Sequence, residues 1–169
     1  MWVALGAIVM MFAALSSVYV ALPRDGWRPI RMPRLFFVSS AIILSSSATM
    51  ESARRALKHG RGRCQRLLTY TLLLGVGFLA LQLLGWHQLI EQKVYLAGQP
   101  HSSFFYLFTG VHGVHMIGGL LGLSYLIFRA QRPVRAPEVE VALFDSAALY
   151  WHFMGGIWIW LFLLLLIWR

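Results

Sequence analysis

Cysteine and acidic side chains are both scarce in this sequence, and each scarcity excludes a class of function. Cys64 is the single cysteine, so the chain can form neither an internal disulfide nor a cysteine-based metal cluster. Six acidic residues stand against fifteen lysines and arginines, and they lie at the ends of apolar runs or between them. Because most run centres are uncharged, an ion pump or a proton-coupled transporter that works alone is disfavoured.

Charge of either sign is low, and apolar residues dominate. The chain is 59% hydrophobic and 12% charged. A soluble domain of 169 residues could not bury so much apolar surface. The net charge of +9 would suggest nucleic acid in a soluble protein, but here the basic residues flank apolar runs, where membrane topology and anionic lipid account for them. We therefore expect a membrane protein with no nucleic-acid partner.

Five runs are candidate transmembrane helices: Trp2–Leu22, Leu35–Met50, Leu67–Ile90, Ser102–Phe128 and Ser146–Trp168. The first lacks the basic start and cleavage pattern of a signal peptide, so we expect a retained span. The second is short, and its helix is expected to continue to about Leu57. Arg54, Arg55 and Lys58 then become candidate contacts for lipid headgroups. The sequence predicts an all-α membrane protein, with residues 1–169 as one domain and a five-transmembrane-helix bundle.

The basic residues are shared unevenly between the two sides of these spans. Nine lie on the N-terminal side: Arg54, Arg55, Lys58, Arg61, Arg63, Arg66, Arg129, Arg132 and Arg135. Six lie on the other: Arg24, Arg28, Arg31, Arg34, Lys93 and Arg169. The bias predicts an N-terminus inside and a C-terminus outside, with Cys64 as a native reporter of the inside.

The second run contains six hydroxyl side chains: Ser39, Ser40, Ser45, Ser46, Ser47 and Thr49. Such a helix is poorly suited to face lipid on all sides. Its hydroxyls can bond back to carbonyls of their own helix, and its small side chains allow close helix contact. We expect this helix inside the bundle or at an interface.

Two histidine-bearing faces are the candidate functional surfaces. His112 and His115 share one helical face, which continues to Gly119. In the last run, His152 is followed by Gly155 and Gly156. A histidine followed by small residues on the same helical face suggests closely packed helices, with imidazoles hydrogen-bonded across the interface. Contact with protons or lipid headgroups, and ligation of metal or haem, are the alternatives.

A bis-histidine haem would need imidazoles from two helices, and His115 with His152 is the candidate pair. At about 1.5 Å per residue, His115 lies roughly 20 Å from the inner end of its run and His152 about 9 Å from its own. This offset disfavours a common haem plane.

Several motifs resemble subunit III of the haem–copper oxidases. Residues 109–115 (TGVHGVH), preceded by Phe104-Phe105, resemble its "FF…TGFHGLHV" motif, and residues 150–153 (YWHF) with Trp158 resemble "YWHFVDVVWL" in its last helix. The Ser/Thr-rich second run and the residues Leu74-Gly75, Phe78-Leu79 and Gln82 resemble further segments of that family in the same order. Five spans are similar to its short bacterial form, which omits the first two helices.

This resemblance implies an accessory, non-redox subunit of a terminal respiratory oxidase in the bacterial inner (plasma) membrane. Such a subunit would pack on subunit I, with subunit II nearby, stabilise it during turnover, hold phospholipid and assist proton uptake. The chain would carry no cofactor or catalytic centre of its own, since haem and copper would lie in partner subunits. The electron donor would be cytochrome c or quinol.

Three acids that this family often carries are replaced here by Ile8, Gly85 and Gly155. Their loss favours scaffolding and lipid contact over a carboxylate-based proton role. It also suits a divergent branch, such as the subunit III-like partners of nitric oxide reductases. The alternative from another class is a haem-binding membrane anchor of a respiratory dehydrogenase or reductase, with His115 and His152 as ligands.

Overall fold

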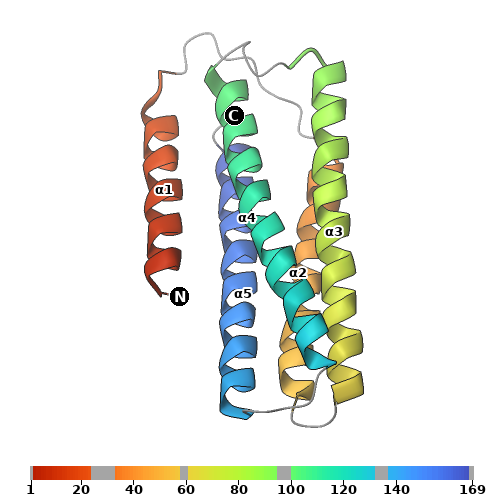
Figure 1. Cartoon of the computed structure of the whole chain (residues 1–169). Coiled ribbons are helices and arrows are strands. Elements are labelled where there is room, and N and C mark those ends of the chain that lie inside the picture. The colour runs from red at the N-terminus through yellow and green to blue at the C-terminus, as the bar shows by residue number, and fades with distance from the viewer. Residues whose placement is uncertain (1, 24–32, 58–60, 95–99, 132–136, 168–169) are drawn as a thin grey trace.

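The computed structural model describes residues 2–23, 33–57, 61–94, 100–131 and 137–167. In these segments it contains five helices: α1 (Trp2–Ala21), α2 (Leu35–Ala56), α3 (Arg61–Glu91), α4 (Pro100–Ala130) and α5 (Pro137–Ile167). Successive helices run in opposite directions, so α1 and α5 both run toward the upper end in Figure 1, and α1 begins about midway along the bundle. All five are long and apolar enough to cross a membrane, which confirms the predicted all-α, five-span fold.

Two helices begin well before their apolar runs. Helix α3 starts at Arg61 rather than Leu67, and α5 at Pro137 rather than Ser146. Proline is favoured at the first helical position, and the acidic Glu138 and Glu140 stabilise the N-terminal end of α5. With 31 residues each, α3, α4 and α5 are about 46 Å long, longer than the roughly 30 Å hydrocarbon core. The apolar run predicts the membrane-crossing part of a helix but not where the helix starts.

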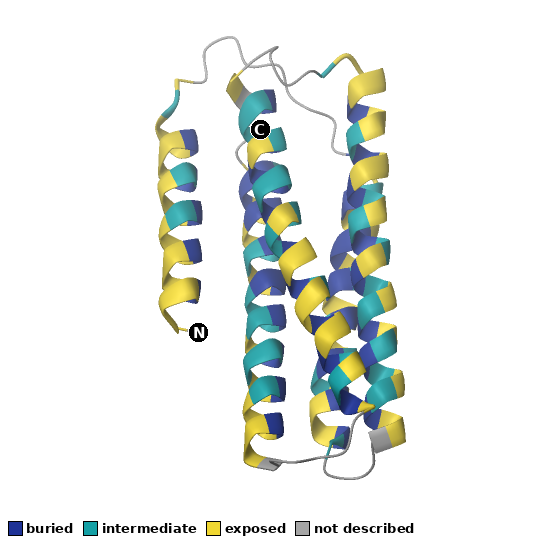
Figure 2. Ribbon diagram, in the orientation of Figure 1, coloured by how far each residue is buried: buried dark blue, intermediate teal, exposed yellow. Residues whose placement is uncertain are grey.

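Helices α2 to α5 form a four-helix bundle, and α1 stands against its side (Figure 1). Helix α2 packs along α3 and α5, and α4 packs on α3 and α5. Helix α1 packs mainly on α4, through buried residues at three- and four-residue spacing: Leu5, Ile8, Phe12, Ser16 and Tyr19. Figure 2 shows that most of its remaining surface is exposed. In its most apolar stretch 22% of the residues are buried, against 39% in α5.

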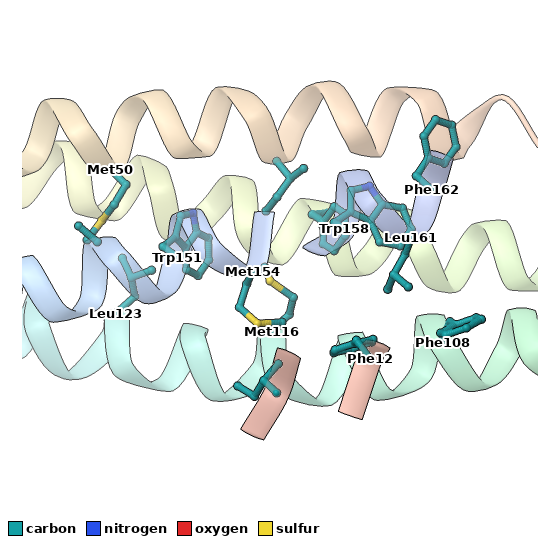
Figure 3. Packing of buried hydrophobic residues seen from close by; sticks show 14 of the residues in the cluster. Phe12, Met50, Phe108, Met116, Leu123, Trp151, Met154, Trp158, Leu161 and Phe162 are labelled. Atoms are coloured by element: carbon teal, nitrogen blue, oxygen red, sulfur yellow. The ribbon is translucent and has the colours of Figure 1, made fainter. Parts of the chain in front are cut away.

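Aromatic side chains of α5 fill the centre of the bundle. Trp151, Met154 and Trp158 lie on successive turns of α5 and are almost completely buried (Figure 3). The Trp158 ring stacks near Phe36 of α2, with ring centroids 6.3 Å apart, and meets Phe78 of α3 edge-on at 5.0 Å. Such edge-on and offset arrangements are the favoured geometry for aromatic pairs. The core therefore joins α2, α3 and α5 around one indole.

Two glycines of α3 make room for these rings. A Cβ added at Gly75 would lie 2.7 Å from Cη2 of Trp151, and one added at Gly85 would lie 2.7 Å from Cζ of Phe36. Both distances are shorter than van der Waals contact. Any side chain at either position would have to displace a buried aromatic ring.

The single cysteine is buried against neighbouring helices. Cys64 lies near the start of α3 and is only 1% exposed. A labelling reagent in water would not reach it readily, so the expected use of Cys64 as a native reporter of the inside is wrong. The basic residues near Cys64 in the sequence predict on which side of the membrane it lies, but they do not predict that its thiol is buried.

We predict opposite responses to alanine at two glycines of α3. Gly75→Ala should destabilise the protein by about 1–3 kcal/mol, because the new methyl group overlaps Trp151 and Leu120. Gly77→Ala, with nothing within 4 Å of the added Cβ, should change stability by less than about 1 kcal/mol. Thermal unfolding of the two variants in mild detergent measures the difference. Equal stability of the two variants would contradict the packing described for Gly75.

Candidate functional site

The serine-rich face of α2 is a buried polar seam. The hydroxyls of Ser39 and Ser40 donate to the Phe36 carbonyl of their own helix, at 3.0 and 2.8 Å. Ser39, Ser40 and Ser46 are all buried, and Thr49 pairs with Thr71 of α3 at 2.8 Å. The serine-rich face of α2 therefore forms an interface with α3 and α5, one of the two placements predicted, while the opposite face with Phe37, Val38 and Leu44 is exposed. The hydroxyls bond back to their own helix as expected.

Indole and amide groups of neighbouring helices donate to this seam. Trp158 Nε1 donates to Ser40 Oγ at 2.9 Å, and Trp151 Nε1 donates to Ser46 Oγ at 2.8 Å. Gln82 Nε2 of α3 donates to Ser39 Oγ at 3.1 Å. These bonds connect α2 to α3 and α5 at membrane depth, where an unpaired polar group is costly. The sequence contained both partners of each Trp–Ser pair, but no local spacing relates residues more than 100 positions apart.

His112 takes no part in this pairing. It is 1% exposed, and neither ring nitrogen has a hydrogen-bond partner among the described residues. Its imidazole is instead enclosed by rings from three helices, with centroid distances of 6.4 Å to Phe12, 5.9 Å to Phe78 and 5.4 Å to Trp158. The expected hydrogen bond across the interface is therefore not formed at His112. The residue joins α1, α3 and α5 by ring packing.

His115 and His152 are also placed differently from the expectation. His115 Nδ1 bonds the Val111 carbonyl of its own helix at 2.8 Å, so the imidazole does not bridge two helices. The bond between α4 and α5 at this level runs from the Tyr150 hydroxyl to the His115 carbonyl oxygen, at 2.9 Å. His152 is half-buried and forms none of the hydrogen bonds that join the described helices.

The depth offset inferred for His115 and His152 is too large. Gly119 packs against Tyr150 and Trp151, so these three residues lie at one level. His115 is four residues before Gly119 and His152 one residue after Trp151, which leaves an offset of about 4 Å along the helices. The ends of the apolar runs do not mark a common depth, because α5 begins nine residues before its run.

The three candidate glycines have different surroundings. A Cβ at Gly119 would lie 3.1 Å from the Tyr150 ring, and one at Gly155 would lie 3.3 Å from the Ser47 hydroxyl. Both glycines are buried and permit close contact between helices. Gly156 is exposed, and nothing in the described chain lies within 4 Å of an added Cβ. The small-residue face of α5 therefore packs at Gly155 and not, within this chain, at Gly156.

Other side chains of the bundle pack against the positions where the resembling family carries acids. Ile8 is 9% exposed in the stripe of α1 that faces the bundle. The Phe36 ring covers Gly85, and α2 covers Gly155. A carboxylate at Gly85 would collide with that ring, so the acid could not be restored without moving Phe36.

A charged cluster closes one end of α2. Arg54 makes two bonds to Glu51, at 2.8 and 3.0 Å, and a third to Asp145 of α5 at 3.2 Å. Arg55 also bonds Glu51, at 2.8 Å. The candidate headgroup residues Arg54 and Arg55 thus already have carboxylate partners, and Lys58 lies outside the described residues. Exposed ion pairs of this kind contribute little stability.

Two arginines at the start of α3 have no carboxylate partner among the residues that the structure describes. Arg63 and Arg66, with Leu67 and Tyr70, line a hollow of about 370 Å³. Arg66 Nε donates to the Gly62 carbonyl at 3.4 Å, and neither arginine pairs with an acid of the described segments. A pair of guanidinium groups beside a tyrosine hydroxyl can accept an anion such as phosphate.

No metal-binding cluster is found in the described segments, where no three His, Cys, Asp or Glu side chains gather. His87 pairs with Glu91 of its own helix at 3.4 Å, and both side chains are exposed. The arrangement of the described side chains is that of a packed bundle with internal hydrogen bonds.

Comparison with known proteins points to one family. The family model described as cytochrome c oxidase subunit III matches residues 7–169. The chain is 31% identical to cytochrome c oxidase subunit 3 of Bacillus subtilis, over 95% of this chain and 81% of that protein. It is 28% identical to the subunit 3 of a Synechocystis species, over 93% of this chain and 72% of that protein.

Vertebrate relatives match over a smaller share of their length. The chain is 32% identical to cytochrome c oxidase subunit 3 of Gallus gallus, over 86% of this chain but 55% of that protein. The family model covers α2 to α5 and α1 from residue 7 onward, including the His112 and Trp151 segments that carry the resemblance. This multi-pass membrane chain therefore belongs to the cytochrome c oxidase subunit III family.

Proposed function

We propose that this chain is the accessory, non-redox subunit of a terminal respiratory haem–copper oxidase in a bacterial plasma membrane. The family match over residues 7–169 carries the proposal. The family is one subunit of a multi-subunit cytochrome c oxidase, so other subunits accompany it. The partners are subunit I, which holds haem and copper, and subunit II.

The interior of the bundle supports a scaffolding role for this subunit. Trp151 and Trp158 occupy its centre, and their indole groups are hydrogen-bonded to α2. Ile8, Gly85 and Gly155 stand where acids are common in the family, and two of these positions are glycines against other side chains. Stabilisation of the active centre during turnover therefore outweighs proton supply in this proposal. In it, the faces around His112, His115, Gly119, His152, Gly155 and Gly156 serve packing.

Removal of the subunit should leave the oxidase spectrum nearly unchanged, because the haem and copper ligands lie in partner subunits. Activity should instead fall progressively during turnover. The measurement is a reduced-minus-oxidised spectrum of the complex with and without this chain, beside a time course of oxygen consumption. Loss of a haem band while subunit I is fully present would refute the proposal and favour the haem anchor. Faster nitric oxide than oxygen reduction by the copurified complex would point to a nitric oxide reductase instead.

The orientation we propose is an N-terminus inside and a C-terminus outside. Exposed positions replace the buried Cys64 as reporters: Gly62 on the N-terminal side and Gln92 on the other. In a Cys64→Ala background, Gln92→Cys should react with a membrane-impermeant maleimide on intact cells. Gly62→Cys should react only after the cells are opened. The reverse pattern would overturn the orientation.

We also propose that the subunit holds an anionic phospholipid. Arg63 and Arg66 contact its headgroup more strongly than Arg54 and Arg55 do. Exposed Tyr70 and Leu73 continue from the arginines along α3 and offer a path for an acyl chain.

The paired substitution Arg63→Gln and Arg66→Gln should reduce the anionic phospholipid that copurifies with the complex. The matched control, Arg54→Gln with Arg55→Gln, removes the same charge from groups already paired with Glu51 and should lose less lipid. Mass spectrometry of the extracted lipids measures both. If the Arg54→Gln, Arg55→Gln variant loses more lipid than the Arg63→Gln, Arg66→Gln variant, Arg54 and Arg55 are the headgroup contacts instead.

A further inference from the structure

Three buried side chains of the described segments leave polar atoms without a hydrogen-bond partner. These atoms are Ser16 Oγ on α1, Gln82 Oε1 on α3 and both ring nitrogens of His112 on α4. None of the three residues is more than 7% exposed. Buried polar groups in native proteins are paired with protein or with ordered water, so each of these atoms requires a partner.

Gln82 and His112 lie at nearly the same height on neighbouring helices. Helices α3 and α4 run in opposite directions (Figure 1), and Trp86 Nε1 of α3 donates to Thr109 Oγ1 of α4 at 3.1 Å. Gln82 is four residues before Trp86, so it is level with position 113 of α4. The offset between Gln82 and His112 is therefore about 1.5 Å along the helix axis.

Both side chains belong to the inner faces of their helices. Gln82 is one turn after Phe78 on the same face of α3. The Phe78 ring is 5.9 Å from the His112 ring and 5.0 Å from the Trp158 ring. Gln82 Nε2 donates to Ser39 of α2, which leaves Oε1 as the unpaired end of the amide. The unpaired groups of α3 and α4 therefore lie on the same level of the bundle interior.

The imidazole of His112 is less closely packed than the rings beside it. Phe78 and Trp158 meet edge-on with their centroids 5.0 Å apart. An imidazole is smaller than an indole, so an equally close edge-on contact would bring its centroid nearer still. The edge-on distances of His112 are instead 5.9 Å to Phe78 and 6.4 Å to Phe12.

The unpaired atoms of Gln82 and His112 need a donor. Gln82 Oε1 can only accept, and an uncharged imidazole has one N–H group and one nitrogen that only accepts. Backbone N–H groups inside a helix already bond to the preceding turn, so they cannot serve these acceptors. Carbonyl oxygens can accept a second bond, as that of Val111 does from His115. The missing partner is therefore a group with two protons to donate.

Ser16 cannot meet this need. Its hydroxyl has a single proton, so it could serve one of the two acceptors and would leave the other unpaired. A serine in a helix can also give that proton to a carbonyl of its own helix, as Ser39 and Ser40 do.

We infer that a water molecule is bound between α3 and α4 at this level, where it donates one proton to Gln82 Oε1 and the other to a ring nitrogen of His112. Buried water typically makes two to four hydrogen bonds to polar groups that lack other partners. In this position the water extends the buried polar seam of α2 through Gln82 to α4. The imidazole of His112 would then be joined to α3 by hydrogen bonds as well as by ring packing.

A high-resolution map of the unmodified chain in its complex tests this site directly. Density for one water should lie about 2.7–3.2 Å from both Gln82 Oε1 and a His112 ring nitrogen. Two results would overturn the inference. One is an empty position in a map that shows ordered water elsewhere in the protein interior. The other is a direct bond from another side chain to either acceptor.

A double-mutant cycle gives a second measurement. Gln82→Met and His112→Phe each remove one side of the bridge, so the double variant should lose less thermal stability than the two single losses added together. The matched control pairs Gln82→Met with His115→Phe. Its effects should add, because the His115 imidazole bonds its own helix. Additive losses for Gln82 and His112, measured by thermal unfolding in mild detergent, would contradict a shared water.

Discussion

The indole N–H groups of Trp151 and Trp158 reach two serine hydroxyls of α2 across the centre of the bundle, and the arrangement of the other helices depends on these bonds. A buried indole needs an acceptor, because hydrocarbon offers none. Ser40 can accept because its own proton goes to the Phe36 carbonyl. These bonds account for Ser40 and Ser46 on α2, and the space that the Trp151 ring occupies accounts for Gly75 on α3.

Polar pairing is more complete on the α2 side of the bundle than on the α1 side. In the described chain, the hydroxyl and amide donors between α2, α3 and α5 find acceptors at 2.8–3.1 Å. On this side the Gln82 Oε1 atom has no partner among the described residues, whereas the unpaired atoms of Ser16 and His112 lie toward α1, where Phe12 meets the imidazole.

The sequence predicted features that depend on local pattern. Apolar runs located all five spans, and the serine content predicted that one face of α2 packs against other helices. The family was recognised from two motifs near His112 and Trp151. What could not be predicted depends on distant residues. The serine that pairs with each tryptophan lies on another helix, and the surroundings of Gly156 depend on what faces α5. The imidazole of His112 is enclosed by rings from three other helices. The burial of Cys64 follows likewise from packing rather than from its basic neighbours.

The contact between Phe36 and Gly85 has a consequence for how this chain can change over generations. A carboxylate at position 85 fits only if the ring at position 36 becomes smaller first, since the ring lies 2.7 Å from where a Cβ would be. A smaller residue at 36 alone would leave a cavity beneath Trp158, which is destabilising. Each single substitution is therefore destabilising. An acid at position 85 requires a compensating substitution at position 36, so the two positions can change only together.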